Sequence, residues 1–412
     1  MPMIAITKET TEVPQNIKRS IFLAGPCPRK LEHGDRTWHD DALHYLDSVG
    51  YDGHVFIPLP FVGDYVEGVH WEETYLNIAD VILFWVPRDL ETLPGFTTNI
   101  EFGEWFKSGK AVLGYPPGAP KMSYLDLRAR ENDVQVRPSL EETVDVALQM
   151  VGEGAERVAG EVYVPLHIWR NPGFQSWYVS QRLAGNSLEF AKLLWEFRMP
   201  MAKKTFCWVL KVHVWIESEK RSKTNEFVFT RSDIACILAY VPSAATGDLP
   251  SMLANTRILT VKEFRSPART PDGFVHELPG GYSLKPEQNP LTVASHELQE
   301  ETGLVVDPQR FRKGGGRQLA ATLSSHKAEL FIVEITPEEL ASVEGKEAGV
   351  SSDTELTYVS SCSLQDILNG TVPFDWSMVG MVVGGLFAGK LADSGNEMSV
   401  MRVARPDLFG KS

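Results

Sequence analysis

Cysteine is scarce in this chain of 412 residues, and its four copies, at positions 27, 207, 236 and 362, form no Cys-x-x-Cys pair. Neither a zinc site nor a disulfide framework is therefore indicated, and we expect a reducing, cytoplasmic location. Basic residues are also in deficit, because 40 Lys and Arg stand against 54 Asp and Glu, a formal net charge of −14. Binding to a nucleic-acid polymer depends on clustered Lys and Arg, so this charge disfavours such a partner but allows single nucleotides.

Long apolar runs are missing as well. The run "VGMVVGGLFAG" near the C-terminus falls well short of the roughly 20 residues that a membrane span needs. The N-terminus "MPMIAITKETTEVPQNIKRS" lacks the apolar core of a signal peptide. We therefore expect neither membrane insertion nor targeting.

The chain is long enough for two or three domains. Short apolar runs ("SIFLAG", "HVFIPL", "DVILFWV", "AVLGY") alternate with helical spacing, as in "WHDDALHYLDSVG", over residues 20–150. This alternation predicts an α/β domain over 18–151, with a doubly wound, Rossmann-like parallel sheet.

Residues 152–204 hold Trp169, Trp177 and Trp195, a density typical of a buried connecting element or of interdomain packing. From residue 205 the strand pattern dominates, as in "FCWVLKVHVWI", "ACILAYV" and "RILTVKEF". A glutamate-rich segment, the strand "KAELFIVEIT" and a final helix around "SLQDILNG" follow. This order predicts a separate α+β domain with a mixed sheet over 205–410.

The glutamate-rich segment "NPLTVASHELQEETG" suits a helix that begins after Asn289 and ends at Gly303. Glu297 and Glu301 lie four residues apart and would share one face, with Glu300 beside them. Such carboxylates repel each other, and a divalent cation would turn that repulsion into binding. A solvated acidic face is the alternative for "ELQEE" taken alone.

With its surroundings, the segment resembles the signature of the Nudix hydrolases. Gly281 and Glu287 keep the first spacing of that signature, and the last part is kept by Glu297, Leu298, Glu300, Glu301, Gly303 and Leu304. Two departures are one extra residue after Glu287 and His296 in place of an Arg. The preceding "ELPGG" is like the branch that acts on nucleoside-diphosphate sugars such as ADP-ribose.

This resemblance implies a Mg²⁺ site, with Mn²⁺ as an alternative ion, that serves hydrolysis of a pyrophosphate. Its ligands would be the Gly280 carbonyl, Glu297, Glu301 and one late glutamate, which we assign to Glu355 with Glu344 and Glu347 as alternatives. Glu300 would assist catalysis, and Arg265 would hold a phosphate.

A second constellation follows the strand "DVILFWV" in "PRDLETLPGFTTNIEFGEW". In a parallel sheet the site lies beyond the carboxyl ends of the strands, so Arg88 and Asp89 fall on the active edge and Asp80 on the opposite one. With Thr97 or Thr98 as N-cap, Glu101 lies within about the first helical turn, where the helix dipole keeps a carboxylate ionised. An ordinary first-turn glutamate is the alternative.

Together with "IFLAGP" and "WEETYLNIAD", this stretch resembles the nucleoside 2-deoxyribosyltransferase family over about residues 20–130. The resemblance implies that Glu101 attacks the anomeric carbon of a nucleoside, displaces the base and forms a glycosyl-enzyme ester. It further implies that Glu72 assists the base, with Glu73 next to it, and that Gly25 and Pro26 line the sugar pocket. Gly95 replaces a family Asp, so base recognition would fall to Asp89 or Asn99.

Both resemblances point to nucleotide-derived small molecules. The leading prediction is a bifunctional enzyme of nucleotide metabolism, a hydrolase joined to an N-glycosidase or transferase. The alternative is a nucleotide-binding sensor with one or both domains catalytically degenerate, which His296 and Gly95 favour. We expect nucleotide or nucleoside substrates, no nucleic-acid polymer, no membrane partner and a homo-oligomeric assembly.

Overall fold

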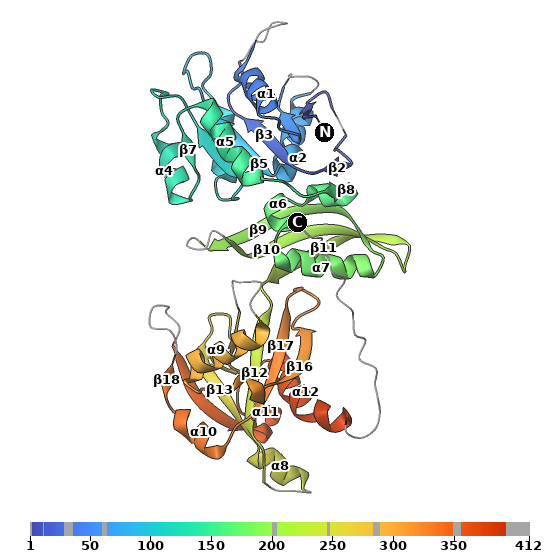
Figure 1. The fold of residues 1–412 in the computed structure, drawn as a ribbon, viewed down its shortest axis with the longest axis vertical. Coiled ribbons are helices and arrows are strands. Elements are labelled where there is room, and N and C mark those ends of the chain that lie inside the picture. The colour runs from blue at the N-terminus through green and yellow to red at the C-terminus, as the bar shows by residue number, and fades with distance from the viewer. Residues whose placement is uncertain are drawn as a thin grey trace. The chain divides into compact units, whose positions relative to one another are not determined.

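A computed structural model describes residues 2–10, 12–28, 36–59, 64–199, 204–244, 248–282, 289–348 and 356–392 (Figure 1). The chain divides into two compact units, Met1–Arg231 (unit 1) and Ser232–Ser412 (unit 2). No helix among these residues is both long enough and apolar enough to cross a membrane.

Unit 1 begins with a six-stranded sheet in the order β1-β4-β3-β5-β6-β7, and every neighbouring pair is parallel. The strands are β1 (Ile4–Thr7), β3 (Ser20–Ala24), β4 (His54–Ile57), β5 (Val81–Trp85), β6 (Ala111–Gly114) and β7 (Val136–Arg137). The parallel α/β fold predicted for this part of the chain is confirmed. The strand order reverses between β3 and β5, where ligands bind in such sheets.

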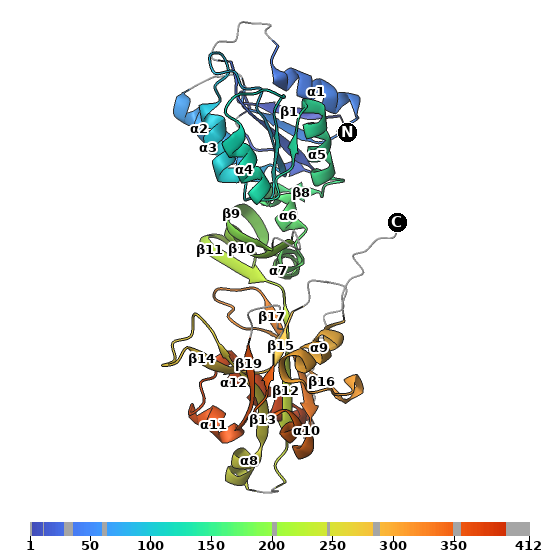
Figure 2. The ribbon, with the colours of Figure 1, turned by 90° about the vertical axis from the view of Figure 1, so that its left-hand side faces the viewer.

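Helices cover both faces of this sheet (Figure 2). On one face lie α2 (Tyr65–Ile78), α3 (Phe96–Trp105) and α4 (Ser123–Glu131), and on the other lie α1 (Trp38–Ser48) and α5 (Leu140–Val151). The continuous apolar run of β3 explains this arrangement: Phe22 and Ala24 pack on the first face, and Ile21 and Leu23 on the second. A strand buried on both faces has no polar alternation to show.

The remainder of unit 1 is a three-stranded antiparallel sheet of β9 (Ser187–Met199), β10 (Lys204–Ile216) and β11 (Arg221–Arg231). Its core includes Phe174, Tyr178 and Trp208, with Trp169 and Trp177 packed against it from α6 (Leu166–Trp169) and α7 (Pro172–Leu183). Residues from 205 to 231 thus pair with the tryptophan-rich segment. The unit boundary falls at 231 rather than at 205, because strand pairing ties β10 and β11 to β9.

Unit 1 also contains β2 (Asn16–Ile17), which pairs with β8 (Arg157–Val158). Asp80, at the start of β5, lies buried beside Arg157 with a shortest separation of 2.6 Å. Its carboxylate also accepts hydrogen bonds from the main-chain N–H groups of Ser20 and Leu166. Asp80 was expected to lie away from the active edge, and its buried ion pair with Arg157 is consistent with a structural role.

Unit 2 contains an eight-stranded mixed sheet along the path β16-β17-β12-β13-β19-β18, with β14 paired to β13 and β15 to β12. The strands are β12 (Ile234–Val241), β13 (Arg257–Phe264), β14 (Phe274–Glu277), β15 (Gly280–Gly281), β16 (Arg312–Gln318), β17 (Lys327–Glu334), β18 (Glu347–Ala348) and β19 (Thr357–Ser363). β12 alternates between two cores, with Ile237 facing one and Leu238 the other.

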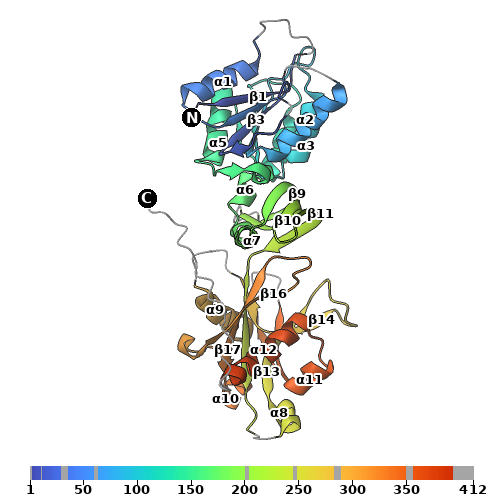
Figure 3. The same ribbon diagram turned by 90° about the vertical axis from the view of Figure 1, so that its right-hand side faces the viewer.

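The helices of unit 2 are α8 (Leu249–Asn255), α9 (Pro290–Thr302), α10 (Pro337–Val343), α11 (Leu364–Asn369) and α12 (Trp376–Ala392) (Figure 3). α9 and α10 pack on one face of this sheet, and α11 and α12 pack on the other. The apolar run near the C-terminus lies in α12, where Val382 is fully buried. A helix thus follows the one at "SLQDILNG", which was expected to be the last.

Candidate active site

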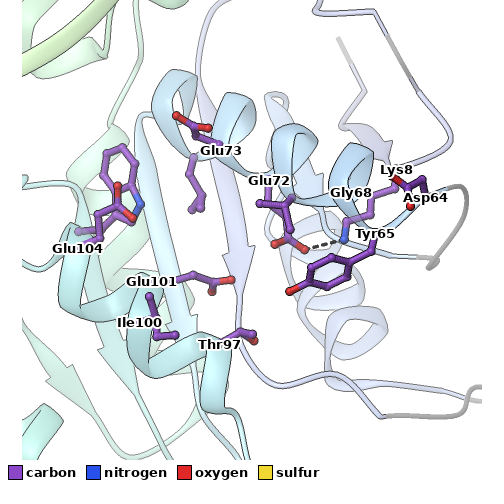
Figure 4. Close-up of a pocket in the computed structure, with 13 residues that line it drawn as sticks. Lys8, Asp64, Tyr65, Gly68, Glu72, Glu73, Thr97, Ile100, Glu101 and Glu104 are labelled. Atoms are coloured by element: carbon purple, nitrogen blue, oxygen red, sulfur yellow. Dashed lines mark hydrogen bonds and ion pairs between the residues drawn. The ribbon is translucent and has the colours of Figure 1, made fainter.

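A cavity of about 590 Å³ lies between α2 and α3 in unit 1 (Figure 4). Its polar lining includes Lys8, Tyr65, Glu72, Thr97, Glu101 and Glu104, and its apolar lining includes Leu76 and Trp105. Concave, mainly apolar spaces with a few convergent polar groups are the usual form of a small-molecule site. The two glutamates predicted from the sequence, Glu72 and Glu101, are brought together here from different helices.

Glu101 projects into the cavity from α3 (Figure 4). Burial and the neighbouring Glu72 carboxylate raise the pKa of Glu101 from 4.5 to about 7, against the opposing effect of Lys8. This direction is opposite to the expectation that the helix dipole keeps Glu101 ionised. The residue that caps α3 is Gly95, in the left-handed conformation with φ +61, and no side chain caps this end. Glu101 consequently lies beyond the first turn, where the dipole is weak.

Glu72 faces the same space from α2 and forms an ion pair with Lys8, whose Nζ lies 2.6 Å from Oε1 of Glu72. Glu73 instead pairs with Lys192 at 2.8 Å and is more exposed. Both glutamates line the cavity, but Glu72 is the one whose charge raises the pKa of Glu101. Lys8 was not singled out from the sequence. The only local signal for it is the short apolar strand "IAIT" that precedes it.

Gly25 and Pro26 follow β3 and support the start of α3. A Cβ on Gly25 would lie 2.2 Å from the carbonyl oxygen of Trp85, so only glycine fits there. The Pro26 carbonyl accepts a hydrogen bond from Nε1 of Trp38 at 3.0 Å, and its ring lies against Gly95. Neither residue is among the described ones that line the cavity. Their contacts fix the loop beside it.

Arg88 links the end of β5 to α3. It is 6% exposed; Nη2 donates to Oδ1 of Asn99, and Nη1 donates to the Lys121 carbonyl at 3.0 Å. Burial lowers the pKa of its guanidinium. Asp89 is exposed and accepts hydrogen bonds from the N–H groups of Glu91 and Thr92, which close a turn. Arg88, Asp89 and Asn99 were predicted to bind substrate, and they instead stabilise the loop between β5 and α3. None of them is among the residues that line the cavity.

In unit 2, α9 begins after Asn289, which accepts a hydrogen bond from the Leu291 N–H, and ends at Gly303 with φ +73. Both predicted helix ends are confirmed. Glu301 Oε2 accepts a hydrogen bond of 2.9 Å from the Gly280 N–H, and a Cβ on Gly281 would lie 2.4 Å from the Glu297 carboxyl group. The Gly-Gly strand β15 thus lets both carboxyl groups approach the main chain.

The surroundings of these two glutamates are acidic. Burial raises the pKa of Glu301 to about 8; the Gly280 N–H opposes this, and Glu297, Glu263 and Glu277 add to it. Arg265 forms ion pairs with Glu277 at 2.7 Å and Glu263 at 2.9 Å. The arginine expected to hold a phosphate is therefore already engaged by carboxylates.

The other predicted members of this site are exposed, bonded to other residues, or outside the described residues. Glu300 and His296 are exposed on α9. Glu287 and Glu355 lie outside the described residues. The Glu344 carboxylate accepts a hydrogen bond from the Ser361 hydroxyl and lies 3.7 Å from the Arg257 guanidinium. Within the described ranges no set of three His, Cys, Asp or Glu side chains forms a group that could hold a metal ion. Glu297 and Glu301 still supply the hard oxygen donors that Mg²⁺ prefers.

Comparison with known proteins bears on unit 1. Residues 18–119 match the model of a family described as nucleoside 2-deoxyribosyltransferase like, whereas a search of curated proteins gives no match. The matched range contains Gly25, Glu72 and Glu101 but neither Lys8 nor any part of unit 2. The similarity to this family therefore covers residues 18–119 of unit 1.

Proposed function

We propose that the cavity of unit 1 cleaves or transfers a nucleoside or nucleotide at its N-glycosidic bond, with Glu101 as nucleophile. The observation that carries this proposal is the meeting of Glu101 and Glu72 in one cavity, with the pKa of Glu101 raised to about 7. A carboxyl group with a strongly shifted pKa in a concave site is a candidate catalytic group.

In the proposed reaction the ionised Glu101 attacks the anomeric carbon while the C–N bond breaks. The base leaves with the bonding electron pair and is protonated, and Glu72 assists this departure from the opposite wall. Water or a second base then attacks the same carbon and releases the Glu101 carboxylate. Because only the ionised Glu101 can attack, the rate should rise with pH through about 7.

The test is incubation with a panel of nucleosides and nucleotides, followed by chromatography of the released base, with a second free base added in parallel reactions. We expect Glu101→Ala to lose at least about a thousandfold in rate. Glu153→Gln, an exposed position of unit 1 that does not line the cavity, is the matched control and should keep most of the activity. Unchanged base release by Glu101→Ala would refute the assignment.

For unit 2 we infer a Mg²⁺-dependent hydrolysis of a nucleoside diphosphate derivative such as ADP-ribose. The contacts of Glu297 and Glu301 with β15 support this inference, since they gather two carboxyl groups against one Gly-Gly main chain. These two residues would hold Mg²⁺ or Mn²⁺, which when bound polarises a pyrophosphate oxygen. Glu301 is fixed by the Gly280 N–H, and Arg265 balances the charge of Glu263 and Glu277.

Release of nucleoside monophosphate from ADP-ribose and related compounds, with and without Mg²⁺, tests this second activity. Glu301→Gln should abolish it, and Glu338→Gln, which replaces an exposed carboxylate on α10, should not. If both units bind nucleotides in a thermal-shift assay and leave every one intact, the protein is a nucleotide sensor and both enzymatic proposals fail.

A further inference from the structure

The wall of the unit 1 cavity is completed by residues that precede the matched range 18–119. β1 pairs in parallel with β4 from Ile4 opposite His54 to Thr7 opposite Ile57. The Lys8 N–H then donates to the Leu59 carbonyl at 3.3 Å. An added strand at the sheet edge thus brings the next side chain, that of Lys8, to the cavity.

This N-terminal segment is also fastened to α2. Nε1 of Trp71 donates to the Thr10 carbonyl at 3.0 Å, and the Tyr75 hydroxyl donates to the Glu12 carbonyl at 3.1 Å. Both aromatic residues are buried on the helix that also carries Glu72. The segment and the helix therefore hold Lys8 and Glu72 in a fixed relation.

Lys8 is the only cationic side chain among the described residues that line the cavity. Its side chain is 7% exposed and that of Glu72 is 25% exposed, so the pair is largely withdrawn from solvent. In contrast, the Lys192–Glu73 pair is 38% and 53% exposed. Exposed pairs contribute little, whereas a carboxylate withdrawn from water needs a partner.

The charged and titratable groups around Glu101 come from four elements. Glu72 reaches it from α2, Lys8 from the end of β1, and Glu104 from its own helix α3. Cys27 follows β3 and is the fourth group. Burial, with the charges of Glu72 and Glu101, raises the pKa of its thiol to about 12, so the thiol stays neutral. Lys8 thus supplies the positive charge that offsets two neighbouring carboxyl groups.

We propose that Lys8, carried by an edge strand outside the family-matched residues, is a positioning residue that holds Glu72 beside Glu101 and balances their shared negative charge. The effect of Lys8 on catalysis rests on the proposed function of unit 1, whereas its effect on the ionisation of Glu101 does not. Without this ammonium group, no cation among the described lining residues would offset the effect of the Glu72 charge on Glu101.

The test is a direct titration of Glu101 by NMR, in protein with ¹³C-labelled glutamate and with Glu101→Gln to assign the signal. Removal of the charge in Lys8→Met should move the Glu101 midpoint upward by about one pH unit, and Lys8→Arg should restore it. Lys8→Gln keeps a hydrogen-bond donor without the charge. It should shift the midpoint in the same direction, and it replaces the methionine variant if that variant does not fold.

Lys18→Met is the matched control, because Lys18 also forms an ion pair in unit 1, with Asp52 at 3.5 Å, and does not line the cavity. It should leave the Glu101 midpoint unchanged. A folded Lys8→Gln protein with the wild-type midpoint would overturn the inference, whether or not the enzyme is active.

Base release provides the second readout. Its acid limb should move upward with the NMR midpoint in Lys8→Gln and stay in place in Lys8→Arg. If the wild-type protein releases no base from any substrate, the proposed function fails, and the titration alone decides the role of Lys8.

Discussion

Replacing Glu101 by glutamine removes a carboxyl group whose ionisation the folded protein opposes. The pKa of Glu101 rises from 4.5 to about 7 on folding, chiefly through burial and then through Glu72. Between these values the folded protein binds more protons than the unfolded chain, so stability falls as the pH rises through this window. At 1.36 kcal/mol per pKa unit, the full loss above pH 7 is about 3 kcal/mol.

Glutamine is neutral at every pH and should avoid this loss. We therefore expect Glu101→Gln to unfold with nearly the wild-type free energy at pH 4, and to be more stable by up to about 3 kcal/mol at pH 8. Urea unfolding followed by tryptophan fluorescence measures this, because nine of the ten tryptophans lie in unit 1.

The matched control is Glu153→Gln, an exposed position of unit 1 that does not line the cavity, which should change stability by less than about 0.5 kcal/mol at either pH. The reasoning is refuted if the gain from Glu101→Gln is no larger at pH 8 than at pH 4. In that case the cavity does not oppose ionisation of Glu101.

Three further outcomes are expected. Gly25→Ala should destabilise unit 1 by about 1–3 kcal/mol in thermal unfolding, since its Cβ would lie 2.2 Å from a main-chain oxygen of β5; Gly103→Ala, with nothing within 4 Å, should not. Arg157→Met leaves the fully buried Asp80 without its ion-pair partner and should cost about 3–5 kcal/mol in urea unfolding; equal stability would contradict the role of the pair. In isothermal titration, Glu301→Gln should weaken Mg²⁺ binding at least tenfold, and unchanged affinity would remove this residue from the metal site.

Local sequence signals set several features of the molecule. Asn289 and Gly303 bound α9 because a side-chain acceptor and a residue tolerant of positive φ act within one turn of the helix ends. The apolar runs within residues 20–150 are also local signals. A continuous apolar run indicates a strand that is buried on both faces, as in a parallel sheet. The stretches around Glu101 and Glu72 likewise carry the resemblance to the nucleoside 2-deoxyribosyltransferase family, which the match over residues 18–119 supports.

Placement of the cap on α3 shows where local signals mislead. Thr97 and Thr98 each offer a side-chain oxygen that could cap a helix, which glycine lacks, but α3 begins after Gly95. The loop must pass close to Pro26, whose Cβ would lie 3.3 Å from a Cβ on Gly95, in a left-handed conformation. A contact with a residue almost seventy positions earlier therefore overrides the local preference, and it moves Glu101 away from the helix end.

The sequence by itself determined the parallel strands of unit 1, both ends of α9 and which carboxyl groups belong to each motif, because spacing and end signals act over a few residues. Tertiary structure decided the electrostatics of both sites. Lys8 reaches Glu72 across 64 positions, and Arg265 is engaged by Glu263 and Glu277. Burial and distant charge depend on how the sheet brings these segments together, so the ionisation of Glu101 could not be read from its own neighbours along the chain.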